Sequence, residues 1–336
     1  MQKERIHWID IARGIGIIFV IYAHVLGSHD FRYLFYAFHM PLFFFLSGIL
    51  HKNSEGFTAF LKKSARRLLI PYFIFASLMY FLWFLNLKNH NLSHEAIKQF
   101  LSIFYGNSNN GLMAFNNILW FLPTLFVTRI LFASITGVWG KTKPLIALLF
   151  FFSVFGYIFS IFMPYIKLPF GIETALSGVA FYGTGFLWQK SDNAKNLILK
   201  YKYLLFPILL VLGSITATID FQNYGHQIDM RLSHLNNYFL FYFGAFSGIF
   251  TWIAFSMILK KNSLLETIGK NALILFAWHP IVFIYLNKLL VVFLNLDTID
   301  TLKKIIPLLY TIISISVILF ADSIIKRLRF ALQRLI

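Results

Sequence analysis

Long apolar stretches alternate with short polar segments along the whole chain. A helix needs about 20 mostly apolar residues to cross the hydrocarbon layer of a bilayer. Stretches of this length recur ten times, which predicts an all-α fold: a polytopic integral membrane helical bundle of about ten transmembrane helices. The predicted spans are 9–26, 33–50, 70–87, 119–136, 145–163, 172–188, 203–219, 238–259, 272–287 and 305–325.

The composition also indicates a membrane protein. The 336 residues are 58% hydrophobic and 13% charged, whereas a soluble domain is about 45–50% apolar and about 25% charged. Cys is absent, which excludes a disulfide scaffold, a Cys-based structural zinc site and a thiol nucleophile. Because the last span runs almost to the C-terminus, we expect a single transmembrane domain over residues 1–336 with no appended soluble domain.

The formal net charge of +17 is explained by topology. With the N-terminus inside, 20 of the 30 Lys and Arg residues fall in inner segments, eight in outer segments and two inside spans. Cytoplasmic loops carry such an excess, so we expect cytoplasmic termini and inward-facing loops at 51–69 and 189–202. The charge therefore predicts no nucleic-acid partner, and the lipid bilayer is the partner that the pattern indicates.

Two segments between the spans have a pattern of their own. Residues 57–68 alternate apolar side chains with paired cations, which favours an interfacial amphipathic helix on the inner leaflet that ends at Pro71. Charge that merely sets the topology is the alternative. Residues 88–118 are polar and Asn-rich, with GNSNNG at 106–111, and predict an exposed outer loop.

Ionisable side chains inside apolar spans are costly and usually mark function. Arg13 and His24 are separated by about 20° beyond three helical turns and by about 16 Å of axial rise, so they share one face of the first span. Alternatively, Arg13 snorkels to the inner headgroups and His24 is a satisfied core histidine. The same helix carries small residues that favour close helix packing, namely Ala12, Gly16, Ala23 and Gly27.

Two further histidines stand beside prolines inside predicted spans. His39 comes shortly before Pro41 in the second span, and His279 directly precedes Pro280 in the ninth. Each proline is expected to break the helix and open it near the histidine. Arg129 also lies inside a span, the fourth, and the pattern assigns it no role.

Several common chemistries have no motif here. The chain lacks the GxxxxGK[ST] phosphate loop, the GxSxG elbow and the HExxH zinc motif. Its ten histidines are scattered over both sides and several loops, so no metal site is predicted. A polysaccharide flippase or exporter stays open as an alternative, because intramembrane Arg and His and Pro-broken helices fit transporters too. The Arg13–His24 spacing and the lack of paired internal repeats stand against transport.

Four motifs in a fixed order resemble one family of membrane enzymes. Residues 9–24, IDIARGIGIIFVIYAH, resemble the opening of the membrane-bound acyltransferase 3 family, whose signature is Arg, ten residues, then His. FHMPLFFFLSG (38–48), RRLLIPYF (66–73) and NALILFAWHPI (271–281) follow in the family's order. The chain looks most similar to the fucose 4-O-acetylase-like branch through ILWFLPTLF (118–126), ETALSGVAFYGTGFL (173–187) and IDMRLSHLNNYFLFY (228–242).

This resemblance implies an activity and a location. The family's donor is cytoplasmic acetyl-CoA, or another acyl-CoA, used as a substrate with no permanently bound cofactor. The family O-acylates carbohydrates, so we expect an O-acetyltransferase that modifies a cell-surface or exported glycan. The expected location is the bacterial plasma (inner) membrane, with acyl-CoA, the glycan acceptor and the bilayer as partners. The resemblance leaves the acceptor sugar and the oligomeric state open.

The resemblance and the residues together assign a donor site and a base. Arg13, with Arg66 or Arg67, is expected to hold CoA phosphates at the inner face, where charge-assisted hydrogen bonds are strong. His24 is expected to be the general base for the acceptor hydroxyl. A covalent acetyl-His24 intermediate is the variant mechanism.

Four more residues complete the expected site. His39 and His279 are candidates for orienting the base or stabilising the oxyanion. Glu173 and Arg231 are the candidate acceptor-binding residues at the outer side. Glu173 stands where the branch pattern has an Asp, which leaves its role open.

Overall fold

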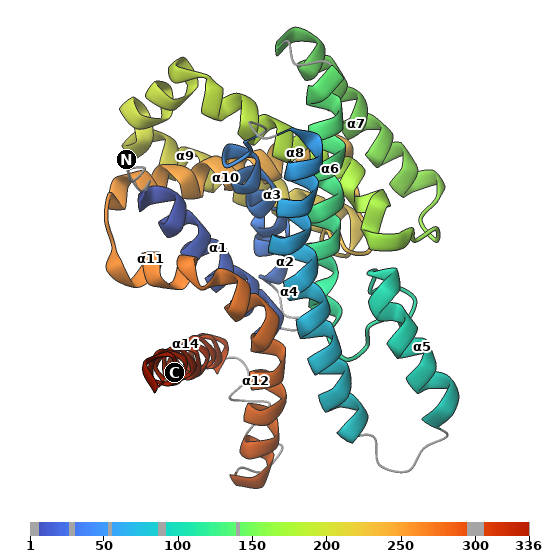
Figure 1. The fold of residues 1–336 in the computed structure, drawn as a ribbon. Helices are drawn as coiled ribbons and strands as arrows, with labels where there is room; N and C mark the ends of the chain where they lie inside the picture. The colour runs from blue at the N-terminus through green and yellow to red at the C-terminus, as the bar shows by residue number, and fades with distance from the viewer. Residues whose placement is uncertain are drawn as a thin grey trace. The chain divides into compact units, whose positions relative to one another are not determined.

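The computed structural model describes residues 7–26, 31–52, 56–86, 92–138, 142–293 and 306–335. It is 85% helical, and this described part contains no β-strand, which confirms the all-α membrane bundle (Figure 1). Within it, eight helices are long and apolar enough to cross a membrane. They are α1 (His7–Val25), α4 (Phe57–Asn86), α6 (Phe121–Val138), α7 (Thr142–Phe162), α9 (Asp192–Tyr224), α10 (Tyr238–Leu259), α12 (Ala272–Phe293) and α14 (Ile306–Leu335).

The other two predicted spans differ from single apolar helices. The segment 33–50 forms α2 (Arg32–Tyr36) and the 11-residue α3 (His39–Ile49). The predicted interruption of the helix near His39 is present, but it lies at residues 37–38, between α2 and α3, and not at Pro41. Pro41 itself lies in the first turn of α3, where no intrahelical bond needs its N–H. The sixth predicted span is α8 (Ile172–Lys190), whose Gly, Ser and Thr residues leave it without an apolar window as strong as those of the eight.

Over its described residues, 92–118, the polar stretch is largely helical and partly buried, so the prediction of an exposed loop is wrong there. It contains α5 (Leu92–Tyr105) and the 3₁₀ turn η1 (Asn117–Trp120). The side chains of Asn107, Ser108 and Asn109 are buried. Two other short helices are η2 (Pro169–Gly171) and α11 (Ser263–Lys270).

Two helices continue where the sequence predicted an end or a break, and a third begins earlier than predicted. The segment 57–68 is not a separate interfacial helix, because α4 runs on through Pro71 into the span. Likewise α12 continues through Pro280. Most of the expected 189–202 loop is the beginning of α9, which the Ser191 side chain caps by accepting a hydrogen bond from the Ala194 N–H. The penalty of one missing backbone hydrogen bond per proline is thus tolerated within long helices.

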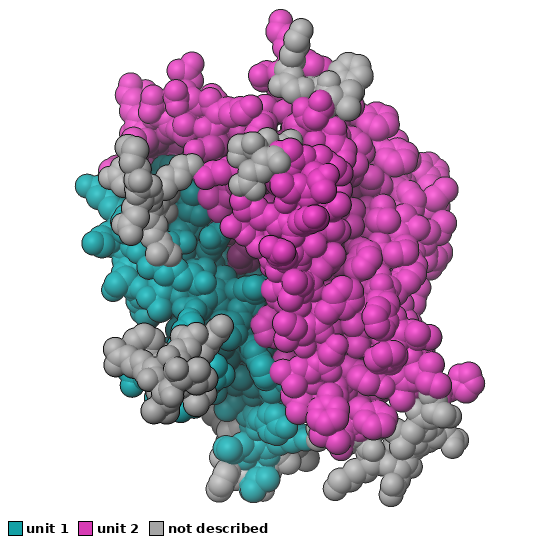
Figure 2. Space-filling model, viewed as in Figure 1, with its two compact units in different colours: residues 1–35, 252–336 teal, residues 36–251 magenta. Residues whose placement is uncertain are grey.

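The chain divides into two compact units, coloured separately in Figure 2. In the first, residues 1–35 and 252–336, α1 packs against α11, α12 and α14. The closest approach is a glycine crossing: a Cβ on Gly14 would overlap the Leu265 carbonyl, and one on Gly269 would overlap the Asp10 carbonyl. A small residue therefore does bring α1 close to a partner helix, at Gly14, which is not one of the predicted stripe. Of the stripe, Ala12, Gly16 and Ala23 are buried, and Gly27 lies outside the described residues.

In the second unit, residues 36–251, α8 packs against α3, α6 and α7. Its backbone approaches α3 at two reciprocal glycines: a Cβ on Gly48 would overlap the Tyr182 carbonyl, and one on Gly185 would overlap the Phe45 carbonyl. The same Gly and Ser content that lowers the hydropathy of α8 therefore allows its dense packing.

Candidate active site

Two histidines lie side by side in the first unit. His24 is in the last turn of α1, and His279 is near the middle of α12. Their ring centroids are 5.3 Å apart, with the ring planes at 60°. The fold therefore places His24, the predicted general base, beside His279, one of the two residues predicted to orient that base or to stabilise the oxyanion.

Both rings are oriented by their own helices. His24 Nδ1 lies 2.6 Å from the Val20 carbonyl oxygen, and His279 Nδ1 lies 3.0 Å from the Leu275 carbonyl oxygen. Because a carbonyl only accepts hydrogen bonds, Nδ1 carries the proton of each neutral ring. The lone pair is then on Nε2, which is the nitrogen that can act as a base.

The two rings differ in access. His24 is half-buried, whereas His279 is fully buried and packs against the Phe283 ring at 5.4 Å. His279 Nε2 has no hydrogen-bond partner among the described residues. His24 is therefore the more exposed ring of the pair, and the fully buried His279 ring lies beside it.

Arg13 lies on α1 nearer the N-terminus than His24, beside an acidic residue. Its Nη1 is 3.8 Å from Asp10 Oδ1, and its side chain is about one-third exposed while Asp10 is buried. On the adjacent helix α11, Glu266 pairs with His7 at 2.9 Å and Lys270 at 3.5 Å. The Arg13 side chain is thus partly exposed beside Asp10, and the His7–Glu266 pair connects the start of α1 to α11.

The other predicted donor-site and helper residues belong to the second unit. His39 is buried at the start of α3, and its ring packs on Tyr36 at a centroid distance of 4.9 Å. Arg66 and Arg67 are exposed on α4. The Arg66 and Arg67 side chains therefore have the exposure that phosphate binding requires. His39, in contrast, is a core residue of the second unit.

Glu173 and Arg231 are joined through two buried asparagines. Glu173 Oε1 accepts from Asn107 Nδ2 at 2.8 Å, and its Oε2 accepts from the Leu168 N–H at 3.0 Å. Asn109 Nδ2 donates both to Asn107 Oδ1 at 2.8 Å and to the Arg231 carbonyl at 2.7 Å. The two predicted acceptor residues thus lie in one hydrogen-bonded group of loops.

This loop group is also rich in charge. Lys167 Nζ donates to the Leu232 carbonyl at 2.7 Å, and Arg231 Nη2 lies 3.6 Å from Asp229 Oδ2. Burial lowers the pKa of the Lys167 ammonium, and nearby Glu173 and Asp229 oppose that shift. The loops are therefore held together by charged groups in a partly desolvated setting.

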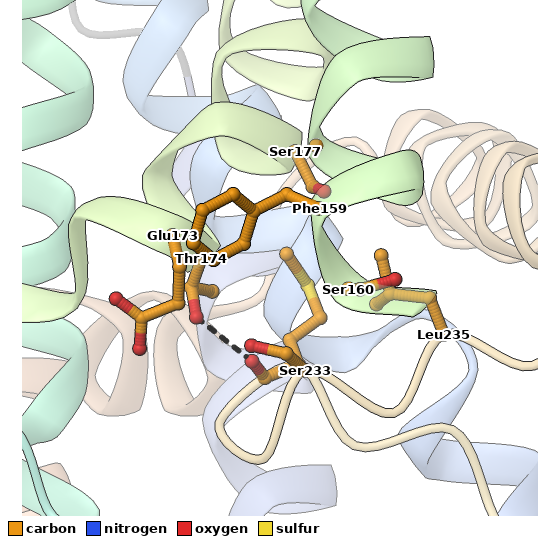
Figure 3. A pocket seen from close by; sticks show the side chains of 9 residues that line it. Phe159, Ser160, Glu173, Thr174, Ser177, Ser233 and Leu235 are labelled. Atoms are coloured by element: carbon orange, nitrogen blue, oxygen red, sulfur yellow. Dashed lines mark hydrogen bonds between the residues drawn. The ribbon is translucent and has the colours of Figure 1, made fainter. Parts of the chain in front are cut away.

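A small cavity adjoins this group (Figure 3). Its volume of about 10 Å³ is near the minimum that one water molecule requires and is too small for a sugar. In Figure 3 the Glu173 carboxylate points away from the Ser160 and Ser233 hydroxyls, and the dashed hydrogen bond runs from Thr174 Oγ1 to the Met230 carbonyl. The lining residues are Gly156, Phe159, Ser160, Glu173, Thr174, Ser177, Met230, Ser233 and Leu235.

Comparison with known proteins decides the family. Residues 6–326 match the model of the Acyl_transf_3 family, described as an acyltransferase domain. The chain belongs to the acyltransferase 3 family. It is therefore a multi-pass membrane acyltransferase, and the match extends through both compact units. No curated protein and no solved structure matches the chain, and the fucose 4-O-acetylase-like branch stays a prediction.

In this acyltransferase, the Arg–ten residues–His signature lies on one uninterrupted helix, α1. Arg13 and His24 are therefore held at a fixed separation along the same axis. Among the residues that the structure describes, no three His, Cys, Asp or Glu side chains come together as metal ligands.

Sequence reasoning missed two features of the acyltransferase. Asn107 and Asn109 hold the loop group together, but their Asn-rich stretch suggested exposure. His51 follows the second predicted span and is buried among aromatic rings. The position of His51 directly after the apolar segment 33–50 could have indicated that this histidine is buried.

We expect Glu173→Gln to destabilise the acyltransferase by about 1–3 kcal/mol. Both carboxylate oxygens accept from N–H donors, so the glutamine amide would place a donor against a donor in either orientation. Thermal unfolding followed by tryptophan fluorescence measures this loss. Glu95→Gln, at a half-exposed carboxylate, is the control and should leave Tm nearly unchanged. An unchanged Tm for Glu173→Gln together with a raised acceptor KM would assign Glu173 to acceptor binding instead.

Proposed function

We propose that this enzyme transfers an acetyl group from cytoplasmic acetyl-CoA to a carbohydrate hydroxyl of a cell-surface or exported glycan. The observation that carries this proposal is the His24–His279 pair: His24 is half-buried, its Nδ1 is held by the Val20 carbonyl, and the same helix bears Arg13. Membership of the acyltransferase 3 family favours this chemistry over a polysaccharide flippase or exporter.

In the proposed reaction His24 moves one proton twice. The acceptor hydroxyl gives its proton to His24 Nε2 as its oxygen attacks the thioester carbonyl carbon. The carbon–sulfur bond then breaks, and His24 returns the proton to the CoA sulfur. The Val20 carbonyl keeps the ring in the tautomer that this step needs, and the imidazolium retains that hydrogen bond. Transient acetylation of His24 is the alternative route.

Arg13 is proposed to anchor the donor. A guanidinium forms paired charge-assisted hydrogen bonds with phosphate, and the Arg13 side chain is exposed enough to offer them. The axial rise of about 16 Å from Arg13 to His24 suits the extended pantetheine arm between the CoA phosphates and the thioester. Arg66 and Arg67 are further proposed contacts of the phosphates, and Glu173 and Arg231 are proposed for the acceptor.

One experiment tests the activity directly. The purified protein in proteoliposomes is given acetyl-CoA labelled in the acetyl group together with glycans isolated from the cell surface. We expect label in the glycan as an O-acetyl ester and an equal release of free CoA. NMR of glycans from strains with and without the gene identifies the acceptor position. Label that never leaves acetyl-CoA, or export of glycan without acetylation, would contradict the proposal.

The mechanism requires cytoplasmic termini, which we test by cysteine labelling of a chain that contains no Cys. Asn193→Cys lies at the exposed start of α9, and Tyr165→Cys replaces a side chain that is 89% exposed after α7. We expect an impermeant thiol reagent to label position 165 in intact cells and position 193 only after permeabilisation. Labelling of position 193 from outside would invert the proposed topology in the plasma membrane.

A further inference from the structure

Arg129 is the intramembrane cation to which the sequence pattern assigned no role. It lies half-buried in α6, where its Nε donates to Ser64 Oγ at 3.3 Å and its guanidinium lies over the Phe60 ring at 5.1 Å. No carboxylate of the described residues lies within 4 Å of it. A half-buried guanidinium without a counter-charge among the described residues is costly, and a bound anion would offset that cost.

The charged neighbours of Arg129 are themselves cations. Arg67 on α4 acts on it electrostatically, and Arg129 and Lys190 both act on the His51 ring. Lys190 ends α8, is exposed, and lies over the Phe186 ring with its Nζ 4.3 Å from the centroid. Helices α4, α6 and α8 thus bring three positive side chains to one place in the second unit.

A rigid wall of rings supports this cationic cluster. The His51 ring lies 5.0–5.7 Å from four aromatic rings, and its Nδ1 is 2.9 Å from the Tyr182 hydroxyl. Burial, with Arg129 and Lys190, lowers the pKa of His51 to about 4. His51 is therefore neutral at pH 7, and its Nε2 is buried with no partner among the described residues. The four rings belong to Phe60, Phe132, Tyr182 and Phe186.

We propose that Arg129, with Lys190 at the rim, binds the phosphate ester of an anionic ligand. Arg matches the geometry of phosphate oxygens through paired N–H donors, and Lys adds a point charge. Basic pockets between transmembrane helices take phospholipid headgroups in this way. A phosphate ester is also carried by CoA, so the same chemistry has two sources. This proposal does not depend on acetyl transfer, because binding is measured without turnover.

The test measures binding of two probes to the full-length protein in a neutral detergent. One probe is anionic phosphatidylglycerol, with zwitterionic phosphatidylcholine, which carries no net charge, as the comparison, and the other is free CoA. Affinity is read from the ligand-dependent rise in Tm, because a ligand that binds only the folded state stabilises it. The variants are Arg129→Gln, Arg129→Lys and Lys190→Gln. Lys200→Gln is the matched control, because Lys200 also lies over an aromatic ring, that of Tyr201, and is exposed.

We expect Arg129→Gln to weaken binding of one probe by at least about tenfold, the loss of one charge-assisted hydrogen bond. Arg129→Lys and Lys190→Gln should show smaller losses, and Lys200→Gln none. Loss of phosphatidylglycerol binding alone identifies a lipid headgroup site, and loss of CoA binding alone identifies the donor phosphates. If Arg129→Gln does not fold, Arg129→Lys and Lys190→Gln decide. Wild-type affinity for both probes in every folded variant would overturn the proposal.

Discussion

Replacement of His24 by alanine is expected to abolish acyl transfer while expression and Tm stay close to wild type. A positioned general base contributes about 10²–10⁴-fold to the rate, and a covalent role would make the loss larger. Stability should change little because His24 is half-buried in the last turn of α1 and its Nδ1 bonds to the Val20 carbonyl of the preceding turn of the same helix. CoA release from acetyl-CoA in the presence of the glycan acceptor measures the effect.

Two comparisons make the His24 result specific. His226→Ala, at an exposed histidine in the loop before α10, should leave turnover unchanged. His279→Ala should lower turnover and also Tm, because it empties a fully buried position behind His24. More than about a tenth of wild-type activity in His24→Ala would show that His24 is a structural core histidine.

Replacement of Arg13 by glutamine is expected to raise the donor KM by about ten- to hundredfold. The range follows from the loss of a charge-assisted hydrogen bond of about 1.5–3 kcal/mol to CoA phosphate. Arg13→Lys should recover only part of the affinity, because a point charge does not reproduce the paired donors of a guanidinium. His24→Ala should show the opposite pattern, with CoA binding nearly intact and turnover lost.

Calorimetric titration of CoA into the detergent-solubilised variants separates these effects. Since Arg13 lies beside Asp10, its removal also changes the charge balance of α1, so Tm is recorded for each variant. Lys200→Gln again serves as the control for removal of one exposed positive charge. Equal CoA affinity for wild type and Arg13→Gln would identify Arg13 as a membrane-interface anchor only.

The limits of span prediction are visible in α8 and α4. Hydropathy predicts an apolar helix that faces lipid, so it recognised the eight helices with long apolar windows. The span predicted at 172–188 is also a helix, α8, but its apolar signal is weaker, because its surface is covered by α3, α6 and α7 and glycines make its close contacts. Pro71 was expected to end a helix, but α4 continues through it, because a single missing N–H does not outweigh the many remaining helical bonds.

In the candidate site too, relations within one helix could be predicted from the sequence, whereas contacts between distant segments could not. The relation of Arg13 to His24 was available from spacing alone, because helical geometry converts eleven residues into three turns on one face. The pairing of His24 with His279 was not, because those residues are far apart in the chain and nothing in either helix specifies its neighbour. The burial of Asn107 and Asn109 was likewise hidden, since polar loop residues normally face water.

The sequence by itself determined the all-α membrane class, the family signature on the first span and the cations that mark candidate donor sites. These properties depend on local periodicity, composition and spacing within one helix. Only the tertiary structure decided that His279 backs His24, that Glu173 and Arg231 share one hydrogen-bonded loop group, and that Arg129 lies among cations. Each of these depends on which distant segments pack together, which is set by side-chain shape and by close glycine contacts such as Gly14 with α11.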